Sequence, residues 1–307
     1  MAAATPAFAQ TWPSKPISIV ILFAPGSGTD TMARIFAEKR SAAVGQPVVV
    51  ENKPGANGTI AGNFVAKAAP DGHTLMFTSN TSHAAAAALV KNVPYDQVKD
   101  FETIGLIGLV PFCIVANPTA PFNTIQELVA YVKANPGKLS FGTGNSTGVV
   151  SGETLKRMLG FDALHVPYKS VPPALNDVLG GTLQYMIADM GTVLPHIKAG
   201  RVKAIASTSS ERSPNLPDLK TLREQGIEFD LEGWYAMFAP AKTPRPIIDK
   251  VNAVIRAEYS KPEMQQRMRD FNVILKLGSP EELLAFQKSE IEKWTRLARE
   301  AGIQPEG

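Results

Sequence analysis

The stretch "ISIVILFAPGSGTDTMARIFAEK" (residues 17–39) decides the fold class, because its character changes twice along its length. Residues 17–23 form an apolar, β-branched run, which predicts a short buried strand. The small-residue loop "APGSGTD" (24–30) follows, and residues 31–39 then show the pattern of a helix. A strand, a loop and a helix in this order make up the repeating unit of α/β folds.

Three further stretches repeat this order of strand, small-residue loop and helix. Strands that alternate with helices predict doubly wound, parallel sheets, in which the loops after the strands gather at one edge and bind ligands there. The predicted repeats are 74–78 (strand), 79–83 (loop) and 84–90 (helix), then 138–141, 142–148 and 149–158, then 183–188, 189–192 and 193–199.

The remaining pattern fills in a second layer of elements, mostly helical toward the C-terminus. Each C-terminal helix begins at or near a proline, which suits the first turn of a helix. We expect strands at 47–51, 202–207 and 273–277, and helices at 125–134, 246–259, 262–270 and 280–301.

The repeats fall into two sets, one before about residue 105 and one from about 112 to 230. We therefore expect two α/β lobes, with the second inserted into the first. The first lobe comprises residues 12–108 and 232–307, and the second comprises residues 109–231. The chain would cross between them near 105–111 and 231–240, which predicts a hinge.

The composition excludes several classes of protein. With 31 basic and 28 acidic residues, the formal net charge is only +3, and no basic stripe suggests a nucleic-acid partner. The hydrophobic fraction of 44% is enough for a real core. The single cysteine, Cys113, cannot form an intramolecular disulfide or a cysteine-based zinc site. No paired-carboxylate or histidine motif predicts a metal or a cofactor.

The N-terminus resembles the end of an export signal. "MAAATPAFAQ" carries the small-x-small pattern Ala7-Phe-Ala9 of a signal-peptidase site, so we interpret residues 1–11 as a signal-peptide remnant and tail. A chance alanine-rich tail is the alternative. Export predicts a periplasmic protein, and no run of 18 apolar residues predicts a membrane span.

The glycine-rich loops do not match nucleotide-binding motifs. "APGSGTD" has no lysine for a Walker A loop and lacks the third glycine of a dinucleotide fingerprint. The loop "GTGNSTG" (142–148) contains G-x-S-x-G, the nucleophile elbow of serine hydrolases. Our alternative interpretation is therefore a hydrolase that uses Ser146 with His196 and with Asp177 or Asp189.

Anion binding explains the loops better. Backbone N–H groups in the first turn of a helix have no intrahelical partner, and the helix dipole favours negative charge there. "PGSGT", "SNTSH" and "TGNSTG" are small, hydroxylated and uncharged, and each precedes a helix. Asp30 does not fit beside an anion, so we expect it to cap its own helix. These loops could also be ordinary helix caps.

We predict that the primary carboxylate of a ligand is held by the backbone of two loops, one per lobe. The first supplies Gly26, Ser27, Gly28 and Thr29, and the second supplies Asn145, Ser146, Thr147 and Gly148. Further candidates for the wall of the cavity are Phe23, Asn80, His83, Tyr168 and Asp189.

An ordered set of motifs resembles the Bug-type receptors, which are the extracytoplasmic substrate-binding proteins of tripartite tricarboxylate transporters. The motifs run through nearly the whole chain and are "FAPGSGTDTMAR" (23–34), "VENKPGANGTIAG" (50–62), "APDGHTLMF" (69–77), "VPYD" (93–96), "VPYK" (166–169) and "GRVKAIASTSSERSPNLPDLKTLREQG" (200–226).

The resemblance implies a periplasmic, two-lobed Venus-flytrap protein that is not an enzyme. It implies that two glycine-rich loops and ordered water hold a ligand carboxylate, and these loops map onto Pro25–Asp30 and Thr143–Gly148. Ser27 stands where the family often has glycine. The resemblance further implies a small di-, tri- or aromatic carboxylate or an amino acid as ligand, and integral-membrane permease subunits as partners. We expect a monomer. The alternative to delivery to a permease is a receptor that reports its ligand to a sensor.

Overall fold

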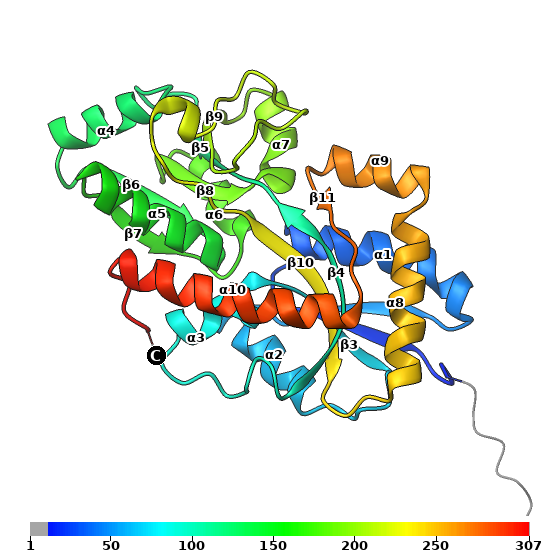
Figure 1. The fold of residues 1–307 in the computed structure, drawn as a ribbon. Helices are drawn as coiled ribbons and strands as arrows, with labels where there is room; N and C mark the ends of the chain where they lie inside the picture. Colours follow the sequence, from blue (N-terminus) through cyan, green and yellow to red (C-terminus); the bar gives the residue numbers. More distant parts are fainter. Residues whose placement is uncertain (1–11, 307) are drawn as a thin grey trace, which may run out of the picture.

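The computed structural model describes residues 12–306, apart from the side chains of residues 39–44. The predicted signal-peptide remnant at 1–11 therefore lies outside the described residues. Two β-sheets flanked by helices form the two halves of the molecule (Figure 1). No helix among the described residues is long and apolar enough to cross a membrane.

The first sheet has the strand order β11-β4-β10-β3-β1-β2. Its central strands are almost wholly buried, as their apolar runs predict. The strands are β1 (Ile17–Ile21), β2 (Val48–Asn52), β3 (Thr74–Ser79), β4 (Phe101–Val110), β10 (Gly233–Pro240) and β11 (Ile274–Leu275).

The second sheet has the order β7-β6-β8-β5-β9 and comes entirely from the middle of the chain. Its strands are β5 (Phe112–Ala116), β6 (Ser140–Thr143), β7 (Leu164–Pro167), β8 (Tyr185–Asp189) and β9 (Lys203–Ser207). The first sheet takes its strands from both ends of the chain and the second from the middle, as expected for an inserted lobe. The exact lobe boundaries stay a prediction.

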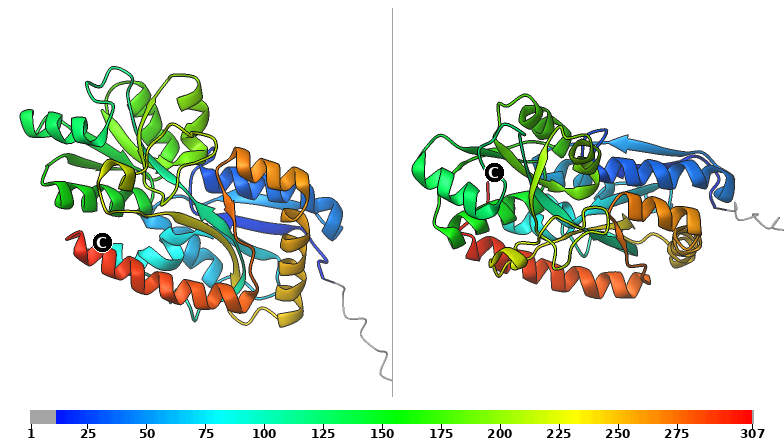
Figure 2. Two further views of the ribbon diagram at one scale, coloured as in Figure 1. Left: turned by 45° about the horizontal axis from the view of Figure 1, so that its top comes forward. Right: turned by 90° about the horizontal axis from the view of Figure 1, so that it is seen from above.

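Helices cover both sheets (Figure 2). They are α1 (Gly28–Val44), α2 (Thr59–Ala66), α3 (Ala86–Leu89), α4 (Ile125–Ala134), α5 (Ser146–Leu159), α6 (Val171–Leu179), α7 (Met190–Lys198), α8 (Arg245–Tyr259), α9 (Pro262–Asp270) and α10 (Pro280–Glu300), with short turns at η1 (Ala56–Gly58), η2 (Thr81–Ala85) and η3 (Arg223–Gln225).

The α/β class is confirmed, but the expectation of wholly parallel sheets is wrong. Strand β1 runs parallel to β2 and β3, whereas β10 is antiparallel to β3 and β4. In the second sheet, β5 is antiparallel to β8 and β9. The sheets are mixed because the strands at the crossings run against their neighbours.

The predicted crossings at 105–111 and 231–240 include the residues between the sheets, but most of their residues belong to strands of the first sheet. Residues 105–110 and 233–240 lie inside β4 and β10 of the first sheet. The chain enters the second sheet at Pro111, which has no N–H for a strand ladder, and returns to the first sheet before β10 begins at Gly233. Strand β10 therefore begins directly at the crossing.

Helix α10 fixes β10 in place. It starts with a capping box at Ser279, lies against β4 and reaches α5 of the second half (Figures 1 and 2). The buried Glu290 carboxylate accepts the indole N–H of Trp234 at 3.0 Å and that of Trp294 at 2.9 Å. This buried pair of charge-assisted bonds anchors the first residues of β10, next to the crossing.

Candidate ligand-binding site

A small cavity lies where the two sheets meet. Both halves contribute to its wall, together with the first residues of β10. The lining residues are Phe23, Ser27, Gly28, Thr29, Ser79, Asn80, Thr81, Val110, Phe112, Gly144, Asn145, Thr147, Ser170, Val171, Asp189, Gly233, Trp234 and Tyr235.

The wall combines aromatic surface with neutral hydrogen-bonding groups. Phe23, Phe112 and Trp234 provide apolar surface, whereas serine, threonine and asparagine side chains provide most of the polar atoms. No lysine, arginine or histidine is among the lining residues. Any anion in this cavity must therefore be held by neutral donors, because burial without hydrogen bonds is very unfavourable for a charge.

The first predicted loop leaves fewer free N–H groups than expected. Ser27 caps α1 by accepting the N–H of Asp30 at 3.2 Å, and its own N–H donates to the Ala24 carbonyl. The N–H of Gly26 donates to the Asp30 carboxylate at 2.9 Å. Gly28 and Thr29 occupy the first turn and face the cavity, so their N–H groups remain for a ligand.

The expectation that Asp30 caps its own helix is wrong, since Ser27 is the cap. The Asp30 carboxylate accepts hydrogen bonds from Gly26, from Arg34 at 2.9 Å and from Asn52 at 3.0 Å. Burial opposes the ionised form, but these donors together lower the pKa of Asp30. Asp30 therefore stabilises the loop through its hydrogen bond with Gly26 and does not line the cavity.

The second predicted loop is arranged in the same way. The Asn145 side chain caps α5 by accepting the N–H of Gly148 at 2.9 Å. The N–H of Ser146 donates to the Thr81 hydroxyl at 3.3 Å. Thr147, the second residue of α5, lines the cavity and is the residue of this turn whose N–H remains for a ligand.

Ser146 lacks the partners of a hydrolase nucleophile. Its hydroxyl is buried and accepts from Asn80 Nδ2 at 2.9 Å, and it also bonds the Thr81 hydroxyl at 2.9 Å. Neither partner is a base. His196 lies in the second half of α7, and its backbone carbonyl accepts from Arg201. The nucleophile elbow pattern at Ser146 is therefore part of an interface between the two halves.

The structure places a third helix start at the cavity, which the sequence analysis did not predict. Ser170 and Val171, at the start of α6, line the cavity. The Ser170 hydroxyl is fully buried, does not cap the helix and has no hydrogen-bond partner. A serine before two prolines is a recognisable helix start, so "SVPP" (170–173) could have revealed it.

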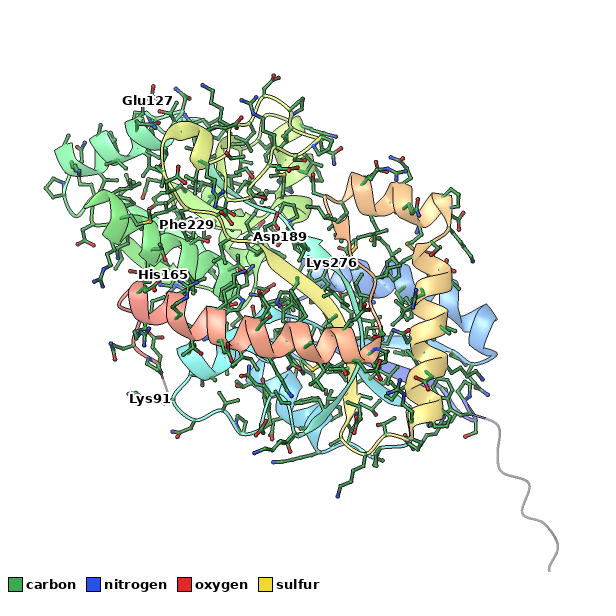
Figure 3. The ribbon with its side chains drawn as sticks, viewed as in Figure 1. Lys91, Glu127, His165, Asp189, Phe229 and Lys276 are labelled. Carbon is green, nitrogen blue, oxygen red and sulfur yellow. The ribbon has the colours of Figure 1, made fainter. Side chains whose placement is uncertain are left out.

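Asp189 is the carboxylate in the cavity wall, at the junction of the two halves (Figure 3). It ends β8 and caps α7, where its Oδ1 accepts the Thr192 N–H at 3.0 Å and the Thr192 hydroxyl at 2.6 Å. Burial nevertheless raises the pKa of Asp189, because desolvation outweighs these bonds.

Tyr235 of β10 lies beside this carboxylate. Burial, together with the negative charge of Asp189, raises the pKa of Tyr235 well above its usual value, and the Thr29 hydroxyl bonds its phenol. The phenol therefore stays neutral. Sequence reasoning missed Gly233, Trp234 and Tyr235 because the strand that carries them was assigned to a crossing.

The other predicted residues lie away from the cavity. His83 is packed between Phe101 and Phe238, with ring centroids 4.5 and 4.1 Å away, and burial lowers its pKa to about 3. Tyr168 donates to the Asp177 carboxylate. Pro25 and Thr143 are also absent from the cavity wall, and the Thr143 hydroxyl bonds His165.

Metal ligands are not grouped in this region. Among residues 12–306, no set of three or more histidine, cysteine, aspartate or glutamate side chains is placed to hold a metal ion.

Comparisons with known proteins agree with this architecture. The solved periplasmic binding protein BugD is 37% identical, with a TM-score of 0.91 over 96% of this chain and 100% of its own. Rpa4515 of R. palustris, solved with adipate, is 30% identical with a TM-score of 0.93 over 96% of this chain and 100% of its own. MatC of Rhodopseudomonas palustris, solved with bound malate, is 32% identical with a TM-score of 0.89 over 94% and 100%.

These matches confirm the two-lobed fold of periplasmic binding proteins, and they connect the chain with solute receptors rather than with enzymes. They also support a location outside the cytoplasm. The model of the tripartite tricarboxylate transporter family receptor matches residues 32–303. The chain therefore belongs to the family of tripartite tricarboxylate transporter receptors.

Proposed function

We propose that the protein captures a small carboxylate in the cavity between its two halves and delivers it to integral-membrane permease subunits. In this proposal, residues 12–108 and 232–307 form one lobe and residues 109–231 form the other. The protein acts as a monomer in the periplasm, in agreement with the small-x-small pattern at residues 7–9, which is typical of a signal-peptidase site.

The observation that carries the proposal is the convergence of three helix N-termini on one cavity without a cationic side chain. Gly28 and Thr29 of α1, Thr147 of α5 and Val171 of α6 present first-turn backbone groups to it. The free N–H groups at the starts of α1 and α5 carry about half a positive charge each, which favours an anion, whereas α6 adds only the N–H of Val171 because Pro172 and Pro173 have none. The Ser170 hydroxyl adds a donor that has no partner among residues 12–306.

The rest of the wall suits the remainder of such a ligand. Phe23, Phe112 and Trp234 offer apolar surface to a short hydrocarbon chain. The adipate and malate bound to two related receptors support a dicarboxylate as the first ligand to test.

Isothermal titration against adipate, malate, succinate, citrate, glutamate, benzoate, nicotinate and terephthalate tests the proposal. We expect saturable one-to-one binding of at least one carboxylate. A ligand at 100 times its Kd should add about 2.7 kcal/mol to the free energy of unfolding, which a thermal melt would register.

The matched control is the uncharged diamide of the best dicarboxylate, for example adipamide for adipate. It has nearly the same shape but no charge, so we expect at least a hundredfold weaker binding. Equal binding of acid and amide, or no response to the whole panel, would show that the site does not recognise carboxylates.

A further inference from the structure

Asn80 bonds both the second half and the first residues of β10. It follows β3 in the first half, lines the cavity and is 2% exposed. Its amide nitrogen donates to the Ser146 hydroxyl at 2.9 Å and to the Thr147 hydroxyl at 3.0 Å, both at the start of α5 in the second half. Both amide hydrogens are thus directed across the junction between the halves.

The amide oxygen of Asn80 faces the crossing strand. It accepts the backbone N–H of Trp234, at the start of β10, at 3.3 Å. Gly233 leaves this contact open, because a Cβ there would lie 3.0 Å from Asn80 Oδ1 and 3.3 Å from Thr147 Oγ1. One side chain therefore contacts the first half, the second half and the strand next to the crossing.

Thr81 extends the same contact. Its hydroxyl accepts the Ser146 N–H at 3.3 Å and bonds the Ser146 hydroxyl at 2.9 Å. Asn80, Thr81, Ser146 and Thr147 are all buried, and the bonds to Ser146 and Thr147 cross to the other half. Moving the halves apart must break the whole set together, because Asn80 and Thr81 are adjacent in the chain and so are Ser146 and Thr147.

We propose that Asn80 is a positioning residue that holds the two lobes closed on each other by direct hydrogen bonds, so that the closed form is populated before a ligand binds. This inference rests on the proposed receptor function and deepens it. A ligand carboxylate then stabilises a closed form that exists already, instead of supplying all of the contacts between the lobes. In this proposal the Ser146 hydroxyl accepts the hydrogen bond from Asn80 that joins the lobes.

Single-molecule energy transfer on the ligand-free protein tests the inference. Dyes on Ala69→Cys and Ala130→Cys, two exposed positions in different halves, report lobe separation, and the native Cys113 is buried and does not label. We expect two populations in the unmodified protein, with Asn80→Ala lowering the ratio of closed to open molecules at least fivefold. An unchanged ratio would overturn the inference.

Thr147→Val, which removes one acceptor and keeps the shape of the side chain, tests the same contact even if Asn80→Ala folds poorly. It should lower the closed-to-open ratio at least twofold, and no change in this ratio would also overturn the inference. In the variant with both changes, Thr147→Val should have little further effect on the closed-to-open ratio, because Asn80→Ala has already removed the same hydrogen bond. Fully additive effects on the ratio would refute the coupling between the two residues. Thr124→Ala, a cap of the distant α4, is the matched control and should leave the ratio unchanged.

These measurements need no ligand, so they are separate from the proposed function. Failure of every carboxylate to bind would overturn the carboxylate proposal and leave the energy-transfer result intact. Closure that depends entirely on an added carboxylate would support the proposed function and overturn the role of Asn80.

Discussion

Gly28 and Asp189 lie directly against each other across the junction of the two halves. A Cβ built on Gly28 would be 2.7 Å from Asp189 Oδ1 and would also collide with the Tyr235 hydroxyl. Carbon and oxygen atoms do not pack that closely, so the start of α1 approaches the end of β8 only because residue 28 has no side chain. This close approach shapes one wall of the cavity.

Gly28→Ala should therefore hinder closure. We expect at least a tenfold loss of affinity for the best carboxylate in isothermal titration, and a loss of about 1–3 kcal/mol of stability, because the added Cβ would collide with the buried Tyr235 hydroxyl of the same half. Gly180→Ala is the control, since the nearest atom to its added Cβ is 3.4 Å away. Unchanged affinity in Gly28→Ala would show that the close approach is not required for binding.

Ser170→Ala separates ligand binding from folding. The Ser170 hydroxyl has no partner in the protein, so its removal should leave the ligand-free melting temperature unchanged. A hydrogen bond to a charged group contributes about 1.5–3 kcal/mol, and we expect a loss of binding free energy in that range by titration. The opposite pattern is expected for Thr124→Ala, which loses the cap of α4 and about 1 kcal/mol of stability without loss of affinity. A destabilised Ser170→Ala variant with normal affinity would refute the assignment.

Asp189→Asn should remove a pH dependence. The pKa of Asp189 is raised above its ordinary value of 3.8, so its contribution to stability is fully present below pH 3.8 and is lost as the pH rises through the raised value. Asparagine caps a helix about as well as aspartate, so α7 should keep its cap.

We expect the Asp189→Asn variant to unfold at higher urea concentration than the unmodified protein at pH 7, with the difference vanishing at low pH. Removing a negative charge from the cavity should also tighten binding of a dianion at pH 7. Parallel stability profiles from pH 4 to pH 8, together with unchanged affinity, would be the contrary result.

His83 should make the protein sensitive to acid. Burial lowers its pKa from 6.5 to about 3, so the unfolded chain binds a proton there that the folded protein does not. Its contribution to the free energy of unfolding should therefore fall by about 1.4 kcal/mol per pH unit as the pH drops below 6.5.

His83→Phe should flatten this slope in urea titrations between pH 6.5 and pH 4, because the ring already packs against Phe101 and Phe238. His196→Gln, at a partly exposed histidine, should change the slope much less. The same acid slope in His83→Phe as in the unmodified protein would show that another group causes it.

The sequence predicted the elements that are strongly periodic. Helices 125–134 and 262–270 were located to the residue, and the strand–loop–helix repeats revealed the two sheets. Most residues of the predicted crossings, 105–110 and 233–240, belong to strands β4 and β10, whose apolar residues there show no alternation. Tyr235 and Trp234 were missed with them.

The site was predicted at the level of loops rather than of atoms. The glycines and hydroxyl residues that mark a helix start are visible in the sequence, but their partners are not. That Asp30 takes the N–H of Gly26, and that Thr81 takes the N–H of Ser146, depends on how distant segments pack. His83 lay in a predicted loop, yet tertiary packing placed it in an aromatic core.

A crystal structure of the protein with the carboxylate that binds best tests the central claim most directly. We predict that one ligand carboxylate lies within hydrogen-bond distance, about 2.7–3.2 Å, of the backbone N–H groups of Gly28, Thr29 or Thr147, with the Ser170 hydroxyl also in contact and no lysine or arginine nearby. A carboxylate paired with a cationic side chain, or bound outside this cavity, would contradict the account.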